Sequence, residues 1–167
     1  MIRCESLLDA SAIHNVHTQA FERENEAQLV KNIRHSDRYI PQLSLVAEVN
    51  NTVVGHILFS YIDLVGKETL RVLGLAPLAV IPKFQKQGIG SALAQVGLET
   101  ADQMSEALVV VLGHPQFYSR FGFQPSINYG IVSPFPVPED AFMVKLLTNY
   151  QEKYQGKVIY PPAFQEV

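Results

Sequence analysis

The residues of this chain best suited to chemistry are the glycines and amides of the turn Gln85-Lys86-Gln87-Gly88-Ile89-Gly90-Ser91. The turn follows an apolar run, Leu78 to Ile81, and Pro82, and it precedes a helix-like pattern. A strand, a glycine turn and a helix start in this order aim unpaired backbone N–H groups and the positive end of a helix dipole at one point. Such a point suits a diphosphate, so the turn predicts a phosphate-bearing ligand.

Gly88 and Gly90 let the backbone of this turn approach a diphosphate closely, because a Cβ at either position would crowd the anion. Lys83 and Lys86 can add positive charge at the rim of such a site. Glycines also permit tight strand-to-helix turns for purely structural reasons, so two glycines alone indicate little. The residues around the turn therefore have to decide what it binds.

A dinucleotide-binding turn is the competing functional interpretation. It needs a third glycine three residues after Gly90, where this chain has Leu93. It also needs an acidic residue closing the next strand, but Leu108 to Leu112 is followed by Gly113 and His114. The dinucleotide fingerprint thus fails at two independent positions.

The composition is that of a single domain. The chain has 167 residues, of which 47% are hydrophobic. This is enough to bury a hydrophobic core without disulfides or metal ions to stabilise it. The formal net charge is −3 and no run of five like charges occurs, so we expect no nucleic-acid partner.

Cys4 is the only cysteine, which excludes an intrachain disulfide and fits a reducing, cytoplasmic environment. No segment approaches the ~20 apolar residues of a membrane span, so we expect no membrane association.

The hydrophobic pattern predicts two short helices followed by an antiparallel meander. Asp9 can cap the first helix, and a second helical pattern follows through residues 29–33. Asn50-Asn51 and Gly66-Lys67 supply the turn chemistry between strands. The inward positions of the first helix are expected to be Ile13, Val16, Ala20 and Phe21. The strands are expected at Leu43 to Val49, Val53 to Ile62 and Thr69 to Val80.

A βαβ unit is expected after the meander. From Ile89 the apolar residues are spaced for one face of a helix, and Leu108 to Leu112 has the pattern of a strand covered on both faces. A short helix is expected from Pro115 to Phe121. Phe123 to Val132 and Phe142 to Leu147 are expected as a final pair of strands, separated by prolines.

The fold class expected from these elements is α/β (α+β), with a mixed sheet of six to seven strands and helices on both faces. We expect one domain over residues 1–150. The tail, residues 151–167, contains Val158, Ile159, Tyr160 and Phe164. That is too apolar for a disordered end, so we expect the tail to dock on the same domain.

The turn and its neighbours resemble the GCN5-related N-acetyltransferase (GNAT) family, whose members transfer an acetyl group from acetyl-coenzyme A to an amine. The family signature is Gln or Arg, two residues, Gly, one residue, then Gly or Ala, and Gln85 to Gly90 fills every position. Leu78-Ala79-Val80 and Tyr118-Ser119-Arg120-Phe121-Gly122-Phe123 resemble family segments as well. Leu112-Gly113-His114-Pro115 and residues 156–162 are similar to a bacterial subgroup of uncharacterised acetyltransferases.

The resemblance implies a GNAT-type fold with acetyl-coenzyme A as co-substrate and no metal. It implies that a backbone N–H of Ala79 or Val80 meets the thioester carbonyl, without a covalent enzyme intermediate. Gln87 stands where relatives frequently carry a basic residue, so the anion site here depends more on backbone groups. The cofactor-binding residues that the resemblance implies are Leu78, Ala79, Val80, Gln85, Lys86, Gln87, Gly88, Ile89, Gly90 and Ser91.

Two side chains are candidates for proton transfer. Tyr118 matches the family's tyrosine and can protonate the departing thiolate, since an unperturbed phenol has a pKa of about 10. The structural alternative is a half-buried aromatic residue that is hydrogen-bonded through its hydroxyl. His114 has an unperturbed pKa suited to proton relay, and its alternative role is to cap the turn beside Pro115.

The general base is left open by the sequence. Acidic residues and an ordered water are the candidates. His14 and His17 lie three apart on the first helix, but no third metal ligand accompanies them, so we expect ordinary helix-surface histidines. Arg120 can either reach a cofactor phosphate or face solvent. The acidic candidates are Glu22, Glu24, Glu26 and Glu68.

Two functions from different classes are consistent with these residues. The first is an acetyl-coenzyme A-dependent N-acetyltransferase that acts on a primary amine of a small molecule or peptide, with Tyr118 as general acid. The alternative is a non-catalytic acyl-coenzyme A sensor or regulatory module of the same fold. Tyr118 favours the enzyme, because a binding module has no need of a leaving-group acid. We expect a cytoplasmic protein and leave open a homodimer formed through the late strands or the tail.

Overall fold

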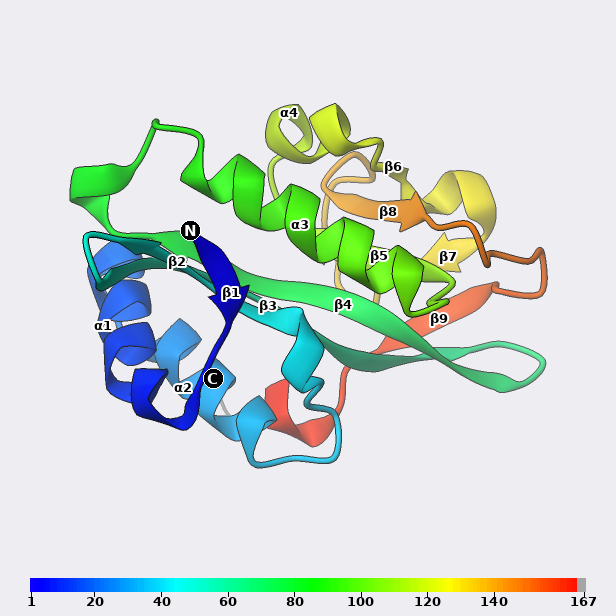
Figure 1. Cartoon of the computed structure of the whole chain (residues 1–167). Helices are drawn as coiled ribbons and strands as arrows, with labels where there is room; N and C mark the ends of the chain where they lie inside the picture. The colour runs from blue at the N-terminus through cyan, green and yellow to red at the C-terminus, as the bar shows by residue number, and fades with distance from the viewer. Residues whose placement is uncertain (165–167) are drawn as a thin grey trace.

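The computed structural model describes residues 1–164 and folds them into one twisted sheet with helices on both faces (Figure 1). Within these residues the sheet has nine strands: seven follow the order β1-β2-β3-β4-β5-β8-β6, while β9 pairs with β3 and β7 pairs with β9. The strands are β1 (Ile2–Cys4), β2 (Ser44–Val49), β3 (Thr52–Val65), β4 (Thr69–Val80), β5 (Leu108–Leu112), β6 (Gln124–Pro125), β7 (Ile131–Val132), β8 (Phe142–Leu146) and β9 (Gly156–Ile159). The α-helices are α1 (Ala10–Phe21), α2 (Asn25–Arg34), α3 (Ile89–Gln103) and α4 (Pro115–Tyr118). The short 3-10 helices are η1 (Leu7–Asp9), η2 (Pro41–Leu43), η3 (Pro82–Phe84), η4 (Ser119–Phe121), η5 (Ser126–Tyr129) and η6 (Pro162–Phe164).

The meander and the βαβ unit are present, as predicted. Asn50 and Asn51 link β2 to β3 with φ of 51° and 63°, left-handed values that asparagine adopts more readily than most residues. The long antiparallel pairing of β3 with β4 runs from Gly55 opposite Val80 to Val65 opposite Thr69. The crossover through α3 then makes β5 parallel to β4. The order of these elements agrees with the GNAT-type α/β fold expected from the sequence.

The helices hold the sheet from both sides, with α3 on one face and α1 and α2 on the other (Figure 1). Gly97 lets α3 approach the sheet closely, because a Cβ there would lie only 2.2 Å from Cε1 of Phe59. On the other face, α1 packs mainly on β3 and β4, and α2 packs on α1 and β4. The buried apolar residues of this second cluster are Ile13, Leu29, Val30, Ile33, Val46 and Leu58.

The region after α4 differs from the single strand expected over Phe123 to Val132. Only β6 and β7 are extended there, and η5 lies between them. Pro125 has no N–H to donate, and Gly130 adopts a φ of 71°, so a continuous ladder cannot form. The sequence reasoning also missed β1, which pairs with β2. These short strands bring the described sheet to nine strands, more than the six to seven expected.

The first helix buries different residues from those predicted. Ile13 and Val16 are buried as expected, but Ala20 and Phe21 are only half-buried. His17, expected on the helix surface, is fully buried. Its Nε2 lies 2.8 Å from Nδ1 of His56 on β3. The buried His56 ring therefore supplies the hydrogen bond that water would make to a histidine on the surface.

Asp9 precedes α1 but does not cap it through its side chain. Its carboxylate accepts hydrogen bonds from the backbone N–H of Ser6, at 2.7 Å, and from the guanidinium of Arg3, at 2.7 and 3.1 Å. The Arg3 hydrogen bond is the main cause that lowers the pKa of Asp9 to about 2. The predicted cap is therefore an ion pair that ties η1 to β1.

Part of the tail belongs to the sheet. β9 pairs antiparallel with the end of β3, with Val158 opposite Leu64, and Val158 is fully buried. None of the helices in the described part of the chain is long and apolar enough to cross a membrane.

Candidate functional site

The candidate site is a cleft that opens where β4 and β5 separate. The two strands are paired only at Leu73 with Val109 and at Gly74 with Val110, so the last residues of β4 lie away from β5. A cavity of about 910 Å³ occupies this region. It is lined by the end of β4, the glycine turn, the start of α3, α4 and the last turn of α1. The lining residues are Ala20, Phe21, Leu78, Ala79, Val80, Phe84, Gln85, Lys86, Gly88, Ile89, Gly90, Ser91, His114, Phe117, Tyr118 and Arg120.

The glycine turn presents unpaired backbone N–H groups to this cleft. Gly88 is the N-cap of α3 with a φ of 84°, a left-handed conformation that glycine adopts without strain. The carbonyl of Gly88 accepts the N–H of Ala92 at 3.0 Å, which leaves the N–H groups of Ile89, Gly90 and Ser91 without partners inside the helix. A Cβ added at Gly88 would meet no atom within 4 Å, so this side of the turn is open. The turn therefore fits an anionic group that approaches the backbone directly.

Gln85, the first residue of the signature, has a structural task. Its Nε2 donates a hydrogen bond to the carbonyl of Val80 at 2.9 Å, which ties the turn to the end of β4. Lys86 follows with a φ of 62° and lines the cleft, while Gln87 does not line it. The structure thus places every predicted cofactor residue on the cleft wall except Gln87, which lies on the outside of the turn and reaches toward the carbonyl of Lys83.

Arg120 crosses from η4 to the start of α3. Its Nη2 donates to Oγ of Ser91 at 3.1 Å, and its guanidinium lies 4.9 Å from the centroid of the Phe117 ring. This places a fixed positive charge beside the unpaired N–H groups of the turn. Arg120 lines the cleft and is exposed, so both roles left open for it, toward a phosphate and toward solvent, stay predictions.

Tyr118 ends α4 inside a cluster of aromatic rings. Phe117 and Phe123 contact it edge to face, with centroids 4.9 and 5.5 Å away. A Cβ at Gly113 would lie 2.5 Å from Cε2 of Tyr118, so that glycine makes room for the ring. Burial raises the pKa of Tyr118 to about 12. The described residues offer its hydroxyl no hydrogen-bond partner, so the hydroxyl is available to a ligand in the cleft that its residue lines.

His114 precedes α4 and lines the same cleft. Its backbone carbonyl accepts hydrogen bonds from the N–H groups of Phe117 and Tyr118, both at 3.1 Å. Its side chain makes no capping hydrogen bond. The backbone of His114, and not its side chain, therefore caps the turn. The imidazole is free to contact a ligand in the cleft.

The acidic candidates for a general base lie elsewhere among the described residues, since none lines the cleft. Glu24 is 2.8 Å from Nε2 of His14, and Glu26 is paired with Arg23 at 2.5 Å. Glu22 is exposed just after α1, and Glu68 lies in the turn between β3 and β4. The cleft instead receives two residues from α1 that the sequence reasoning placed in the core, Ala20 and Phe21.

We predict that Gly88→Ala weakens coenzyme A binding at least about tenfold, because the new methyl group enters the open side of the turn in front of the unpaired N–H groups. The left-handed φ should also cost about 1 kcal/mol of stability. Isothermal calorimetry with coenzyme A and thermal unfolding measure the two effects.

Gly130→Ala is the matched control for that substitution. Gly130 has a similar φ of 71° but lies between η5 and β7, and it does not line the cleft. It should lose comparable stability and keep its coenzyme A affinity. Equal affinities in both variants would contradict the assignment of the turn.

Sequence comparison identifies the relatives of the chain. A model of the acetyltransferase (GNAT) family matches residues 10–123. The chain is 39% identical over 155 residues to the uncharacterized N-acetyltransferase YjhQ of Escherichia coli (strain K12), covering 90% of this chain and 86% of that protein. It is 35% identical over 149 residues to the uncharacterized N-acetyltransferase YhbS of the same strain, covering 89% of this chain and 88% of that protein.

Solved structures agree with the sequence relatives. The crystal structure of the GNAT family N-acetyltransferase YhbS from Escherichia coli in complex with CoA superposes with a TM-score of 0.90, at 35% identity, covering 99% of this chain and 91% of that one. A GNAT family acetyltransferase from Brucella melitensis in complex with acetyl-CoA gives a TM-score of 0.80, at 31% identity, covering 98% and 97%. The chain therefore belongs to the acetyltransferase (GNAT) family, a family of acyltransferase enzymes.

Proposed function

We propose that this protein transfers the acetyl group of acetyl-coenzyme A to a primary amine of a small molecule or peptide by direct attack. The observation that carries the proposal is the hydroxyl of Tyr118, which has no partner among the described residues and belongs to the same cleft as the glycine turn. Similar proteins bound to CoA and to acetyl-CoA support the choice of donor.

The glycine turn and its neighbours would bind the donor. The N–H groups of Ile89, Gly90 and Ser91 would hold the diphosphate, with Lys86 and Arg120 adding positive charge. Leu78 and the backbone of Ala79 and Val80 would lie along the pantetheine arm. Acetyl-coenzyme A supplies the activated thioester, and a backbone N–H of Ala79 or Val80 would polarise its carbonyl.

Tyr118 and His114 would handle the protons. As the amine nitrogen bonds to the carbonyl carbon and the carbon–sulfur bond breaks, Tyr118 would give its proton to the sulfur. The raised pKa of about 12 keeps the phenol protonated at neutral pH, so Tyr118 has a proton to donate in each reaction cycle. His114 is the imidazole among the cleft residues, and it would pass the proton lost by the amine to water, while water would return a proton to the Tyr118 phenolate.

The same site would also serve a non-catalytic acyl-coenzyme A sensor, and one assay separates the two functions. Thiol release is measured spectrophotometrically with acetyl-coenzyme A and a panel of primary amines, beside calorimetric binding of coenzyme A. Release that depends on an amine supports the enzyme. Tight binding without release across a broad panel would favour the sensor.

We propose a cytoplasmic location and a homodimeric assembly. A reducing cytoplasm suits the single, unpaired Cys4. A homodimer through the late strands would cover the half-exposed side chains of Val132, Phe135 and Ile159. Light scattering on the purified protein measures the assembly, and a monomer at all concentrations would contradict the dimer.

A further inference from the structure

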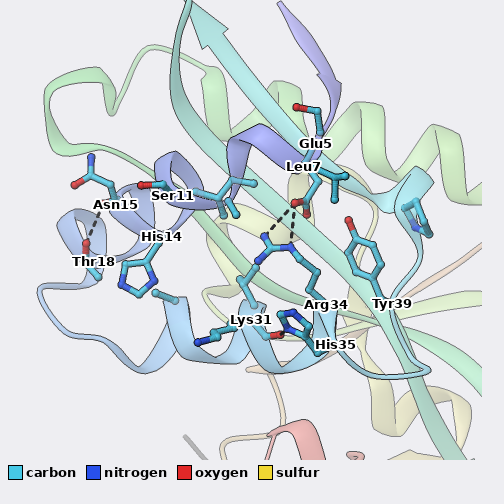
Figure 2. Close-up of a pocket in the computed structure, with 16 residues that line it drawn as sticks. Glu5, Leu7, Ser11, His14, Asn15, Thr18, Lys31, Arg34, His35 and Tyr39 are labelled. Carbon is cyan, nitrogen blue, oxygen red and sulfur yellow. Dashed lines mark hydrogen bonds and ion pairs between the residues drawn. The ribbon is translucent and has the colours of Figure 1, made fainter.

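A second cavity, of about 930 Å³, lies between α1 and α2 (Figure 2). One end is closed by the ion pair of Glu5 and Arg34 and by Tyr39, and Leu7 lies beside it (Figure 2). No described residue lines both this cavity and the cleft at the glycine turn. The cleft reaches α1 only at Ala20 and Phe21, so the two cavities use different parts of that helix.

The floor of this cavity is apolar and its rim is polar. Ile13, Ala27 and Val30 are buried between the two helices and form the floor. Tyr39 and Pro41 extend this surface at the closed end. The polar groups on the α1 side of the rim are Ser11, His14, Asn15 and Thr18.

Arg34 brings unused hydrogen-bond donors to this cavity. Its Nε donates to Oε2 of Glu5 at 3.1 Å. Its Nη2 lies 3.0 Å from the same oxygen but makes no aligned hydrogen bond, and it has no other partner in the described part of the chain. Nη2 is itself buried, but Nη1 makes no hydrogen bond or ion pair to the described residues, so its two N–H groups remain available in the planar fork of the guanidinium. These donors are matched to an oxyanion.

Lys31 adds a second positive charge on the same face of α2. Residues three apart on a helix lie on the same side of it, and both Lys31 and Arg34 line this cavity from α2. Within residues 1–164, Lys31 has no carboxylate at ion-pair distance. His35 also lines the rim, with its Nδ1 2.8 Å from the carbonyl of Lys31.

Glu5 is the one carboxylate among the described lining residues, and it does not make the cavity a cation site. Its side chain is only 4% exposed and is held by Arg34 on one side. On the other side it accepts a hydrogen bond from the hydroxyl of Ser44. Glu24, at the α1 end, is engaged by His14. The charge that is left without a partner in the cavity is therefore positive.

We propose that this cavity binds a carboxylate carried on a short apolar body, such as an aliphatic or aromatic acid. The carboxylate would lie between Lys31 and Arg34, and the apolar body would lie on the floor formed by Ile13, Ala27 and Val30. Because the cavity shares no lining residue with the cleft, this ligand and coenzyme A bind at the same time.

Methyl NMR of the full chain, saturated with coenzyme A, tests the proposal. Hexanoate and benzoate are the probes, hexylamine is the cationic counterpart, and inorganic phosphate is the anion without an apolar body. Saturable shifts of the methyl signals of Ile13 and Val30 with the two acids are expected. Equal binding of hexylamine would overturn the proposed charge preference, equal binding of phosphate would overturn the role of the floor, and no shift with either acid would overturn the site.

Charge reversal at the rim supplies the matched pair of variants. Lys31→Glu should raise the dissociation constant for hexanoate at least about tenfold, since it replaces an attractive charge by a repulsive one. Lys67→Glu makes the same exchange in the exposed turn between β3 and β4 and should leave hexanoate binding unchanged. Lys31 is exposed, so both variants should fold, and circular dichroism checks this. Equal dissociation constants in the two variants would overturn the placement of the carboxylate.

Discussion

Tyr118→Phe is expected to lower the rate of amine-dependent thiol release by about 10²- to 10⁴-fold, the range that a positioned general acid contributes. The aromatic ring stays, so its packing against Phe117, Phe123 and Gly113 is retained. The hydroxyl makes no hydrogen bond to the described residues, so its removal leaves no protein group unpaired. The loss should therefore appear in turnover, with coenzyme A affinity within about twofold of the parent.

Steady-state kinetics and calorimetry on the same preparations separate turnover from binding. Tyr61→Phe is the matched control, because it also removes one phenol oxygen, at a hydroxyl that donates to Glu106 outside the cleft. It should keep its turnover. Parent-like turnover in Tyr118→Phe would remove Tyr118 from the mechanism. A parallel loss of turnover and coenzyme A affinity would make it a binding residue.

The sequence predicts the strand, turn and helix of the site well because their signals are local. Pro82 ends the strand, and Gly88 has the left-handed φ that favours glycine at a helix start. The continuous apolar run Leu108 to Leu112 marks a strand buried on both faces, and its first residues are fully buried. These features depend on neighbours within a few residues, so the pattern of one segment is enough to locate them.

The remaining parts of the site depend on contacts between distant segments. The cleft exists because β4 and β5 stop pairing after Gly74, and no local pattern marks that point. Phe21 reaches the cleft from α1, although its helical spacing indicated only a core position. His17 is buried by a partner 39 residues away, His56. The signal in the sequence that could have indicated this buried pair is His56 itself, a polar residue within the apolar pattern of β3.

The free energy of unfolding is expected to fall as the pH drops below about 6.5, because the fold buries His17 and His56 as neutral rings. Nε2 of His17 lies 2.8 Å from Nδ1 of His56, and Nε2 of His56 lies 2.8 Å from the Oγ of Ser44. Burial lowers the pKa of His17 from 6.5 to about 4, and it lowers the pKa of His56 well below 6.5. The nearby positive charge of Arg34 acts in the same direction on both rings.

The direction of this pH dependence follows from the lowered pKa values. Above pH 6.5 both rings are neutral whether the chain is folded or unfolded, so the pair adds no pH dependence. Between pH 6.5 and about 4, His17 is protonated in the unfolded chain but stays neutral in the folded protein. For His56 the same difference continues to lower pH, because its pKa is well below 6.5. Each histidine should cost about 1.4 kcal/mol of stability per pH unit, or about 3 kcal/mol for His17 over its window.

Urea unfolding at several pH values between about 7 and 5 measures this loss above the range of the carboxylates. Asp9 and Glu26, whose pKa values are lowered in the fold, lose their stabilising contribution only below 3.8 and 4.5. Far-UV circular dichroism is the suitable signal, since the chain has no tryptophan. The double variant His17→Gln with His56→Gln should flatten the pH dependence, whereas exposed His35→Ala should retain it. A stability of the parent protein that stays constant across this range would show that the pair accepts protons in the folded state.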